Sequence, residues 1–288
     1  MDEFFHTVLH LIEHTLVEAL YTIPFLFLAF LLLEFLEHKM SNKIQQTIQK
    51  SGRFGPILAS VLGAVPQCGF SAMAANLYAT RIITLGTLIA VFLSTSDEML
   101  LIMLSSPEFA PKGLIIVLIK IIISAIIGFL VDIICRRFSE EKQTIHEFCE
   151  HEHCHCEKGI FRSALIHTLK ITLFIIVVQF ALNCIMHTFG EDAIADFLSK
   201  GGFFTPIISA VVGLIPNCAS SVLITELFMS NSISLGSCLS GLLTGSGIGM
   251  LILFKANRPM KQNVLILLLS FAVGSVIGIA VDLLGIMI

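Results

Sequence analysis

The strongest constraint on the fold is an internal repeat. Residues 52–104 align without gaps with residues 202–254, at a constant offset of 150, and 17 of the 53 paired positions are identical. A repeat of this length predicts two structurally equivalent parts. We place the first repeat at 1–138, a polar linker at 139–159 and the second repeat at 160–288. The identical pairs include Gly63/Gly213, Pro66/Pro216, Cys68/Cys218, Ser71/Ser221 and Gly86/Gly236.

The composition places both repeats in a membrane. The chain is 56% hydrophobic and only 13% charged, which is about half the charged share of a soluble domain. Its net charge of -4 gives no basic surface for nucleic acid. Apolar runs long enough to cross a ~30 Å hydrocarbon core recur along the chain, and the acidic N-terminus lacks the features of a cleavable signal peptide. We therefore expect an all-α, multi-pass protein of the cell (inner) membrane, surrounded by the lipid bilayer.

Each repeat has the same order of apolar segments: a long first helix, an interrupted segment and two further segments. The first arm of the interrupted segment spans 54–65 in the first repeat, and as a helix of that length it is too short to cross the membrane. We therefore predict one re-entrant hairpin and three crossing helices in each repeat, which makes ten apolar segments. A kinked helix that crosses is the alternative, because proline is tolerated in membrane helices.

The distribution of Lys and Arg favours the hairpins. With hairpins, 13 of the 17 positive residues lie on one side of the membrane and two on the other, whereas continuous crossing would give 9 and 6. The positive side is cytoplasmic, and it includes the linker 139–159. Three crossings per repeat is an odd number, so the repeats have inverted orientations, as in many secondary transporters. The matched pair Asp132 and Asp282 lies near helix ends, where we expect the membrane interface.

Two pairs of motifs are candidates for a substrate site. The hairpin tips read Val-Pro-Gln-Cys-Gly at 65–69 and Ile-Pro-Asn-Cys-Ala at 215–219, so each brings an amide and a thiol into the membrane. The third apolar segment is interrupted by Ser-Thr-Ser-Asp-Glu at 94–98 and by Thr-Gly-Ser-Gly at 244–247. Alternatively, the amides cap freed backbone and the cysteines only fill space. The predicted substrate-binding residues are Gln67, Cys68, Ser71, Ser94, Thr95, Ser96, Asn217, Cys218, Ser221, Thr244 and Ser246.

Ionisable residues inside the apolar segments are a second group of candidates. We assign a coupling or charge-balancing role to Asp97, Glu98, Lys120 and Glu226, because charges within a membrane are functional by default. Thr95 and Glu98 have the spacing of a capping box, which predicts that a helix restarts there. The alternative is that the two acids only cap this helix. Lys120 could pair with Asp97, Glu98 or Glu226.

The linker carries a third candidate site. Four histidines and three cysteines fall within residues 146–156, which is enough for a tetrahedral site that holds Zn²⁺ or a similar ion. Thiolate and imidazole ligands together suit soft or borderline ions. A solvated, charged linker without a specific role is the alternative, and transport itself requires no cofactor. The predicted ligands are Cys149, His151, His153, Cys154, His155 and Cys156.

The first tip and the break that follows it resemble the ArsP-like permeases. The residues that carry this resemblance are Gly63-Ala-Val-Pro-Gln-Cys-Gly-Phe-Ser71, Leu85-Gly86 and Phe92-Leu-Ser-Thr95. They are similar to the Gly-rich Pro-x-Cys stretch and the Leu-Ser-Thr helix break of that superfamily. Over nearly its full length, the chain is most similar to the branch of ten-helix heavy-metal exporters, whose members are labelled arsenic efflux proteins or manganese transporters.

The resemblance implies a transporter. The better-studied permeases of the group export trivalent organoarsenicals and carry a Cys-x-Cys-type pair. In this chain the position two after Cys68 is Phe70, and the position two after Cys218 is Ser220. The leading hypothesis is secondary-active efflux of a metal ion or metalloid, such as an arsenical or manganese. The alternatives are an exporter of a small organic anion held by helix N-termini and Lys120, and a metal-sensing membrane protein. No ATP-binding motif or nucleophile–base pair suggests an enzyme, and a homodimer is a further expectation.

Overall fold

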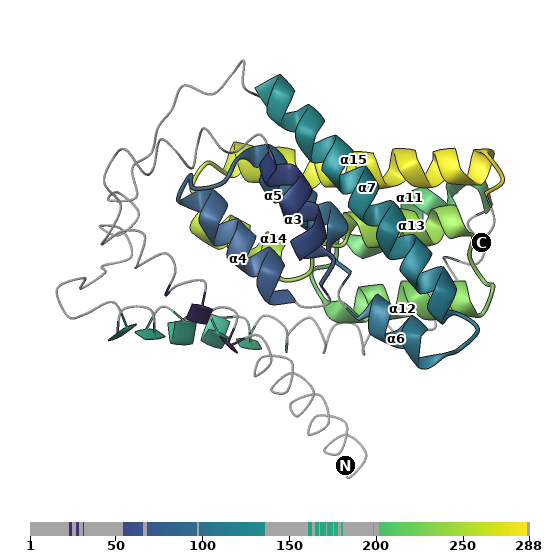
Figure 1. Ribbon diagram of the computed structural model, residues 1–288, viewed down its shortest axis with the longest axis horizontal. Coiled ribbons are helices and arrows are strands. Elements are labelled where there is room, and N and C mark those ends of the chain that lie inside the picture. Colours follow the sequence, from purple (N-terminus) through teal and green to yellow (C-terminus); the bar gives the residue numbers. More distant parts are fainter. Residues whose placement is uncertain are drawn as a thin grey trace, which may run out of the picture.

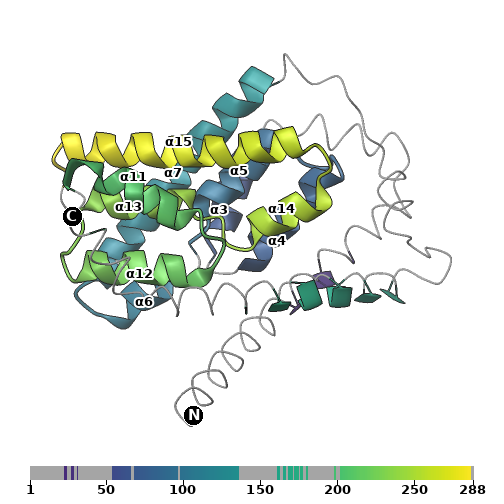
Figure 2. The same ribbon diagram turned by 180° about the vertical axis from the view of Figure 1, so that it is seen from behind.

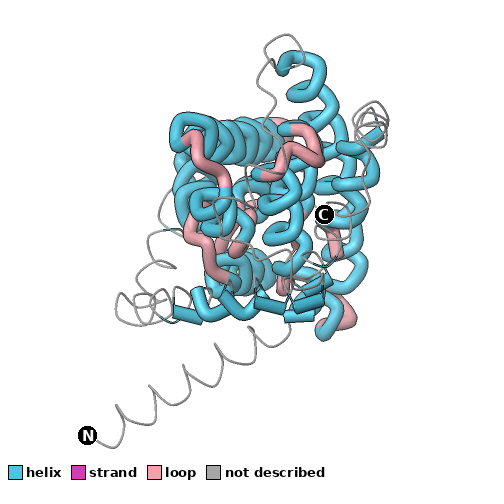
Figure 3. The backbone as a smooth tube through the Cα atoms, turned by 90° about the vertical axis from the view of Figure 1, so that its left-hand side faces the viewer, coloured by secondary structure: helices cyan, strands magenta, loops and turns pink. Residues whose placement is uncertain are grey.

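In the described part of the chain, every regular element is a helix (Figure 1, Figure 3). The computed structural model describes residues 54–65, 68–96, 98–135 and 202–286, together with scattered residues within 23–31 and 161–198. The long first helix expected in each repeat falls mainly outside these residues, and so does the linker 139–159. The all-helical fold class is confirmed for the remainder.

The helices repeat as the sequence does. The first repeat contributes α3 (Gly55–Gly63), α4 (Cys68–Ala79), α5 (Leu85–Ser94), α6 (Met99–Ser105) and α7 (Ala110–Cys135). The second repeat contributes the 3₁₀ helix η3 (Gly202–Phe204), then α11 (Thr205–Gly213), α12 (Cys218–Met229), α13 (Leu235–Thr244), α14 (Gly249–Ala256) and α15 (Met260–Leu283). Each α-helix of the second repeat begins 150 positions after its counterpart in the first. Proline stands in the first turn of both α3 and α11, where its missing N–H has no helical partner to lose.

The third segment of each repeat is broken in its middle, as predicted. Residues 95–98 separate α5 from α6, and residues 245–248 separate α13 from α14. Gly247 adopts a φ of 52° in the second break, a left-handed conformation that glycine takes without a steric penalty. Four helical stretches of the described residues are long and apolar enough to cross a membrane: Leu85–Ser105, Ala110–Cys135, Leu235–Ala256 and Met260–Leu283. The re-entrant path of the short helices and the inverted orientation stay predictions.

The broken segments lie inside the molecule and the unbroken helices lie at its edge. The most apolar stretches of the two broken segments are 71% and 83% buried, compared with 33% for α7 and 28% for α15. Figure 2 shows α15 running along one edge of the molecule. The exposed side chains of α7 and α15 are mostly Leu, Ile and Val. These faces therefore suit contact with lipid, and the breaks are placed in the protein interior.

The two repeats hold each other through the second arms of the broken segments. α4 packs against α14, and α12 packs against α6, as both ribbon views show (Figure 1, Figure 2). Gly249 at the start of α14 allows the first of these contacts to be close. A Cβ at this position would stand 2.7 Å from Cβ of Ser71 and 2.9 Å from Cε1 of Phe92. Each second arm therefore contacts the return arm of the other repeat, and α6 also packs against α7 of its own repeat.

Matched carboxylates fix the starts of the broken segments. Asp132 on α7 accepts hydrogen bonds from the Thr84 hydroxyl at 2.7 Å and from the Gly86 N–H at 2.8 Å. Asp282 on α15 makes the same two bonds, at 2.8 and 3.0 Å, with the residues 150 positions further along the chain. The first N–H groups of a helix have no intrahelical partner, so each carboxylate supplies one. The pair expected at the membrane interface thus has a structural role in both repeats.

Candidate functional site

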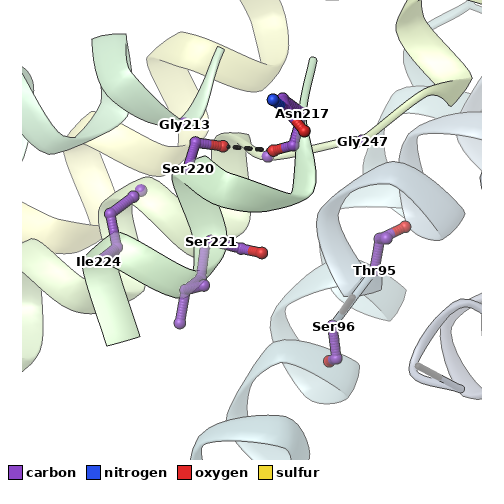
Figure 4. A pocket seen from close by; sticks show the side chains of 11 residues that line it. Thr95, Ser96, Gly213, Asn217, Ser220, Ser221, Ile224 and Gly247 are labelled. Atoms are coloured by element: carbon purple, nitrogen blue, oxygen red, sulfur yellow. Dashed lines mark hydrogen bonds between the residues drawn. The ribbon is translucent and has the colours of Figure 1, made fainter. Parts of the chain in front are cut away.

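A small pocket lies where the two repeats meet at the breaks (Figure 4). It has room for about one water-sized group. Thr95 and Ser96 line it from the first repeat, and α11, α12, α13 and the second break line it from the other side. The lining residues of the second repeat are Gly213, Asn217, Ser220, Ser221, Ile224, Gly241, Leu242, Gly245 and Gly247. Four predicted substrate-binding residues are therefore brought together: Thr95, Ser96, Asn217 and Ser221.

The pocket is lined by hydroxyl oxygens that can accept from a ligand. All four lining hydroxyls donate their protons to backbone carbonyls close to them in sequence. The donor–acceptor distances are 2.7 Å for Thr95 and Ser220, 2.8 Å for Ser221 and 3.1 Å for Ser96. A hydroxyl that donates to the backbone keeps acceptor lone pairs. The four side chains therefore offer oxygen ligands to whatever occupies the pocket.

Asn217 fixes the first turn of α12 beside the pocket. It is the N-cap residue of α12 and is 2% exposed. Its side-chain oxygen accepts from the Ala219 N–H, although the 3.5 Å distance makes this a weak bond. The helix begins at Cys218, so the partial positive charge of the helix N-terminus lies at the pocket wall. The capping interpretation of the second tip is thus compatible with a site at the same place.

Lys120 joins the two breaks. It lies in the middle of α7 and is fully buried. Its ammonium donates a hydrogen bond to the carbonyl of Thr95 and another, of 2.8 Å, to the carbonyl of Leu242. These carbonyls belong to the ends of α5 and α13, where a helix leaves acceptors without partners and carries a partial negative charge. Both carbonyl-bearing residues also line the pocket, so the positive charge stands directly behind its wall.

The structure corrects two details of the predicted charge cluster. Glu98, and not Thr95, is the N-cap residue of α6, and no side-chain bond caps that helix. The capping box does not form because the Thr95 hydroxyl bonds back to the carbonyl of Val91 at 2.7 Å. Glu226 is exposed in the last turn of α12. Of the three acids that could pair with the fully buried Lys120, Glu226 is therefore the one that its exposure disfavours.

The other described candidates do not line this pocket: Ser71, Ser94, Cys218, Thr244 and Ser246. All five are buried. The Ser94 and Thr244 hydroxyls donate to carbonyls within their own helices, at 3.1 and 2.8 Å. Outside the described residues lie Gln67, Asp97, the side chain of Cys68 and the six predicted metal ligands of the linker, whose roles stay predictions.

Several lining residues were missed at the level of sequence. Ser220 stands where the first repeat has Phe70, and Gly241 stands where it has Val91. Gly213 is required because a Cβ there would stand 2.2 Å from the carbonyl oxygen of Gly241. The sequence signal that could have identified Ser220 and Gly241 is that each is a small residue aligned with a large residue of the first repeat. The prediction rested on identical pairs, and at Ser220 and Gly241 the two repeats differ.

The fold and the pocket define a multi-pass helical membrane protein with a polar site between two repeats. A family model, ArsP_2, described as "Putative, 10TM heavy-metal exporter", matches residues 11–158 and 136–247, which together cover most of the chain. The chain therefore belongs to this family, as the tip motifs predicted. Neither the curated proteins nor the solved structures contain a match to the chain.

Proposed function

We propose that the protein is a secondary-active exporter that binds a metal ion or metalloid in the pocket between its two repeats. The oxygen-lined pocket at the two breaks carries this proposal. Transporters built from repeats bind substrates where discontinuous helices meet, because unwound backbone and helix ends supply ligands there. Membership of a heavy-metal exporter family supports the same class of cargo.

The lining supports a hard or borderline ion as cargo. Hydroxyl, amide and carbonyl oxygens suit ions such as Mn²⁺, whereas trivalent arsenic prefers thiolates. Cys218 is 2% exposed and does not line the pocket. A divalent ion held by neutral oxygens needs a balancing carboxylate. Glu98 is half-buried at the end of the first break and follows Asp97 directly, so we assign this role to the two acids.

The exchange of arms between repeats supports a mechanism for alternating access. α14 is held by α4 of the other repeat, and α6 is held by α12. A movement of one predicted hairpin therefore carries the second arm of the opposite break with it, and the pocket lies between the two breaks. We propose that this coupled movement exposes the pocket first to the cytoplasm and then to the outside, in an inner membrane with the linker 139–159 cytoplasmic.

A substrate panel tests the proposal. The purified protein in proteoliposomes would be given Mn²⁺, Zn²⁺, Co²⁺ and arsenite, with and without a proton gradient. We expect one of these species to move faster than in empty liposomes and to respond to the gradient. Ser221→Ala removes one lining oxygen and should slow transport roughly tenfold, the equivalent of about one hydrogen bond. The matched control is Ser230→Ala, whose hydroxyl is exposed at the far end of α12. Absence of transport for the whole panel would contradict the proposal.

A small organic anion is the second candidate cargo. The N-terminal turn of α12 and the buried ammonium of Lys120 both place positive charge at the pocket. An anion would be attracted to this wall, whereas a cation must be balanced by carboxylates. The same liposomes separate the two candidates. Uptake of small carboxylates, in the absence of transport of any metal or arsenite, would favour the anion.

A further inference from the structure

The contacts of Lys120 have the form of a cation-binding site. Its Nζ donates to one carbonyl from each repeat, at Thr95 and at Leu242. Both carbonyls lie where a helix is interrupted, and the site is fully closed to solvent at the ammonium. In discontinuous helices, such unpaired carbonyls at C-terminal ends are the groups that bind small monovalent cations. An ammonium and a sodium ion carry the same charge and compete for the same oxygens.

We propose that Lys120 occupies a monovalent-cation site built by the two broken helices, so that its ammonium acts as a coupling cation tethered to the protein. Protonated Lys120 fills the site. When the pocket opens to water, one Nζ–H bond breaks, its electron pair stays on the nitrogen and the proton passes to water. The neutral side chain then leaves the site, and the two carbonyls become free for another cation. Protonation of Lys120 therefore has the same effect as the binding of a sodium ion at a site of this kind that contains no lysine.

The tethered cation gives the cargo site a means of coupling. Thr95 and Leu242 line the pocket on one side and hold the ammonium on the other. A cation in the pocket and a protonated Lys120 repel each other at this range. Entry of the cargo therefore favours loss of the proton, and its release favours return of the proton. This coupling rests on the proposed transport function, but the cation site itself does not.

Among the described residues, few titratable groups lie on the helices packed against α7. The helices packed against α7 are α3, α5, α6 and α13, and of these α3 and α5 contain no titratable side chain. Glu98 precedes α6 and follows Asp97, and Cys238 on α13 interacts electrostatically with Lys120. The other titratable residues of α7 itself are Lys112, Asp132 and Cys135. Glu98, Asp97 and Cys238 are therefore the groups whose protonation must be considered in a pH experiment.

Thermal unfolding of the purified full-length protein tests the cation site without any cargo. The unfolding midpoint would be measured in NaCl, KCl and choline chloride at equal ionic strength. Lys120→Ala removes the tethered cation and leaves space, so NaCl or KCl should raise its midpoint by about 5 °C over choline, in a saturable way. Lys120→Met keeps the side-chain length and blocks the site, so it should gain little. The wild-type protein and Lys112→Ala should also gain little at neutral pH.

Two results would overturn the inference. Lys120→Ala could gain no more from Na⁺ or K⁺ than the wild type does, or Lys120→Met could gain as much as Lys120→Ala. If Lys120→Ala does not fold, Lys120→Ser provides the test, because it also shortens the side chain and leaves the space open, so Na⁺ or K⁺ should protect it more than choline does. The absence of such protection in Lys120→Ser, with the fold intact, would equally contradict the site. Since no cargo is present, these results are independent of the substrate panel.

Discussion

The two repeats share a backbone plan but fill it differently. Ser220 and Gly241 line the pocket beside the second tip, and their counterparts in the first repeat are Phe70 and Val91. Phe92 is also fully buried in the first repeat, where it packs against the start of α14. Small side chains thus leave space beside the second break. Large side chains fill the equivalent space in the described part of the first repeat. A symmetric backbone does not require a symmetric site.

The charges have the opposite distribution. Glu98 and Lys120 belong to the first repeat, and the equivalent positions of the second repeat hold Ile248 and Ser270. Ser270 is buried and donates its hydroxyl proton to a carbonyl of its own helix. The space for a ligand therefore comes from the second repeat and the charge from the first. Neither repeat carries the complete set of groups.

The largest effect is expected from closing the second-repeat pocket with a single methyl group. In Gly213→Ala, the new Cβ would stand 2.2 Å from the Gly241 carbonyl oxygen, and its other near neighbours are also backbone atoms. In Gly63→Ala, the nearest atom is the Ser94 hydroxyl, which can rotate, and the nearest backbone atom is the Val91 carbonyl oxygen at 2.8 Å, further than the 2.2 Å at Gly213. We expect Gly213→Ala to lose about 3 kcal/mol of stability and nearly all transport, and Gly63→Ala to lose less of both. Unfolding midpoints and liposome transport measure this, and equal losses would remove the proposed asymmetry.

A smaller effect should follow from the matched carboxylates. Asp132→Asn removes the charge from two hydrogen bonds at the start of α5, and should cost about 1 kcal/mol of stability. Asp282→Asn makes the same change at α13, but Asp282 is exposed and Asp132 is half-buried. We therefore expect a smaller fall in the unfolding midpoint for Asp282→Asn. A larger fall for Asp282→Asn would show that exposure does not govern these two caps.

The cysteines of the two tips should matter less still. Cys218→Ser keeps the size and polarity of the side chain but removes the affinity for soft metals. Because the pocket is lined by oxygens and not by Cys218, transport of a hard ion should persist at more than about half the wild-type rate. Cys68→Ser in the first repeat provides the matched variant. Loss of transport in either variant, with the protein correctly folded, would restore the predicted thiol site.

The smallest effect on transport is expected from a deletion in the linker between the repeats. Deletion of residues 146–157 should leave the transport rate of the purified protein unchanged, because the pocket is built from the repeats alone. A reduced peptide of residues 144–159 should nevertheless bind Zn²⁺ in calorimetry. The affinity should fall as the pH falls, because protons compete for the thiolates and imidazoles. No binding at neutral pH would contradict the predicted ligands.

Local features of the site were predictable from the sequence, whereas three-dimensional ones were not. The break at 95–98 follows from its polar residues, and the break at 245–248 from its glycines. Lys120 was predictable as a buried charge because it lies deep in an apolar helix. Its carbonyl partners were not predictable, because they depend on how two helix ends meet across the repeats. The capping box at Thr95 failed for the related reason that its hydroxyl has a competing acceptor within its own helix.

The exchange of arms has a consequence for the synthesis of the protein. α4 ends at Ala79, but α14, which covers it, begins only at Gly249, about 170 residues later. At usual rates of translation this interval lasts roughly 10–30 s. During this time Ser71 and its neighbours are without the surface that encloses them. The newly made first repeat therefore remains unfinished until the second emerges, which makes the order of synthesis itself a condition for assembly.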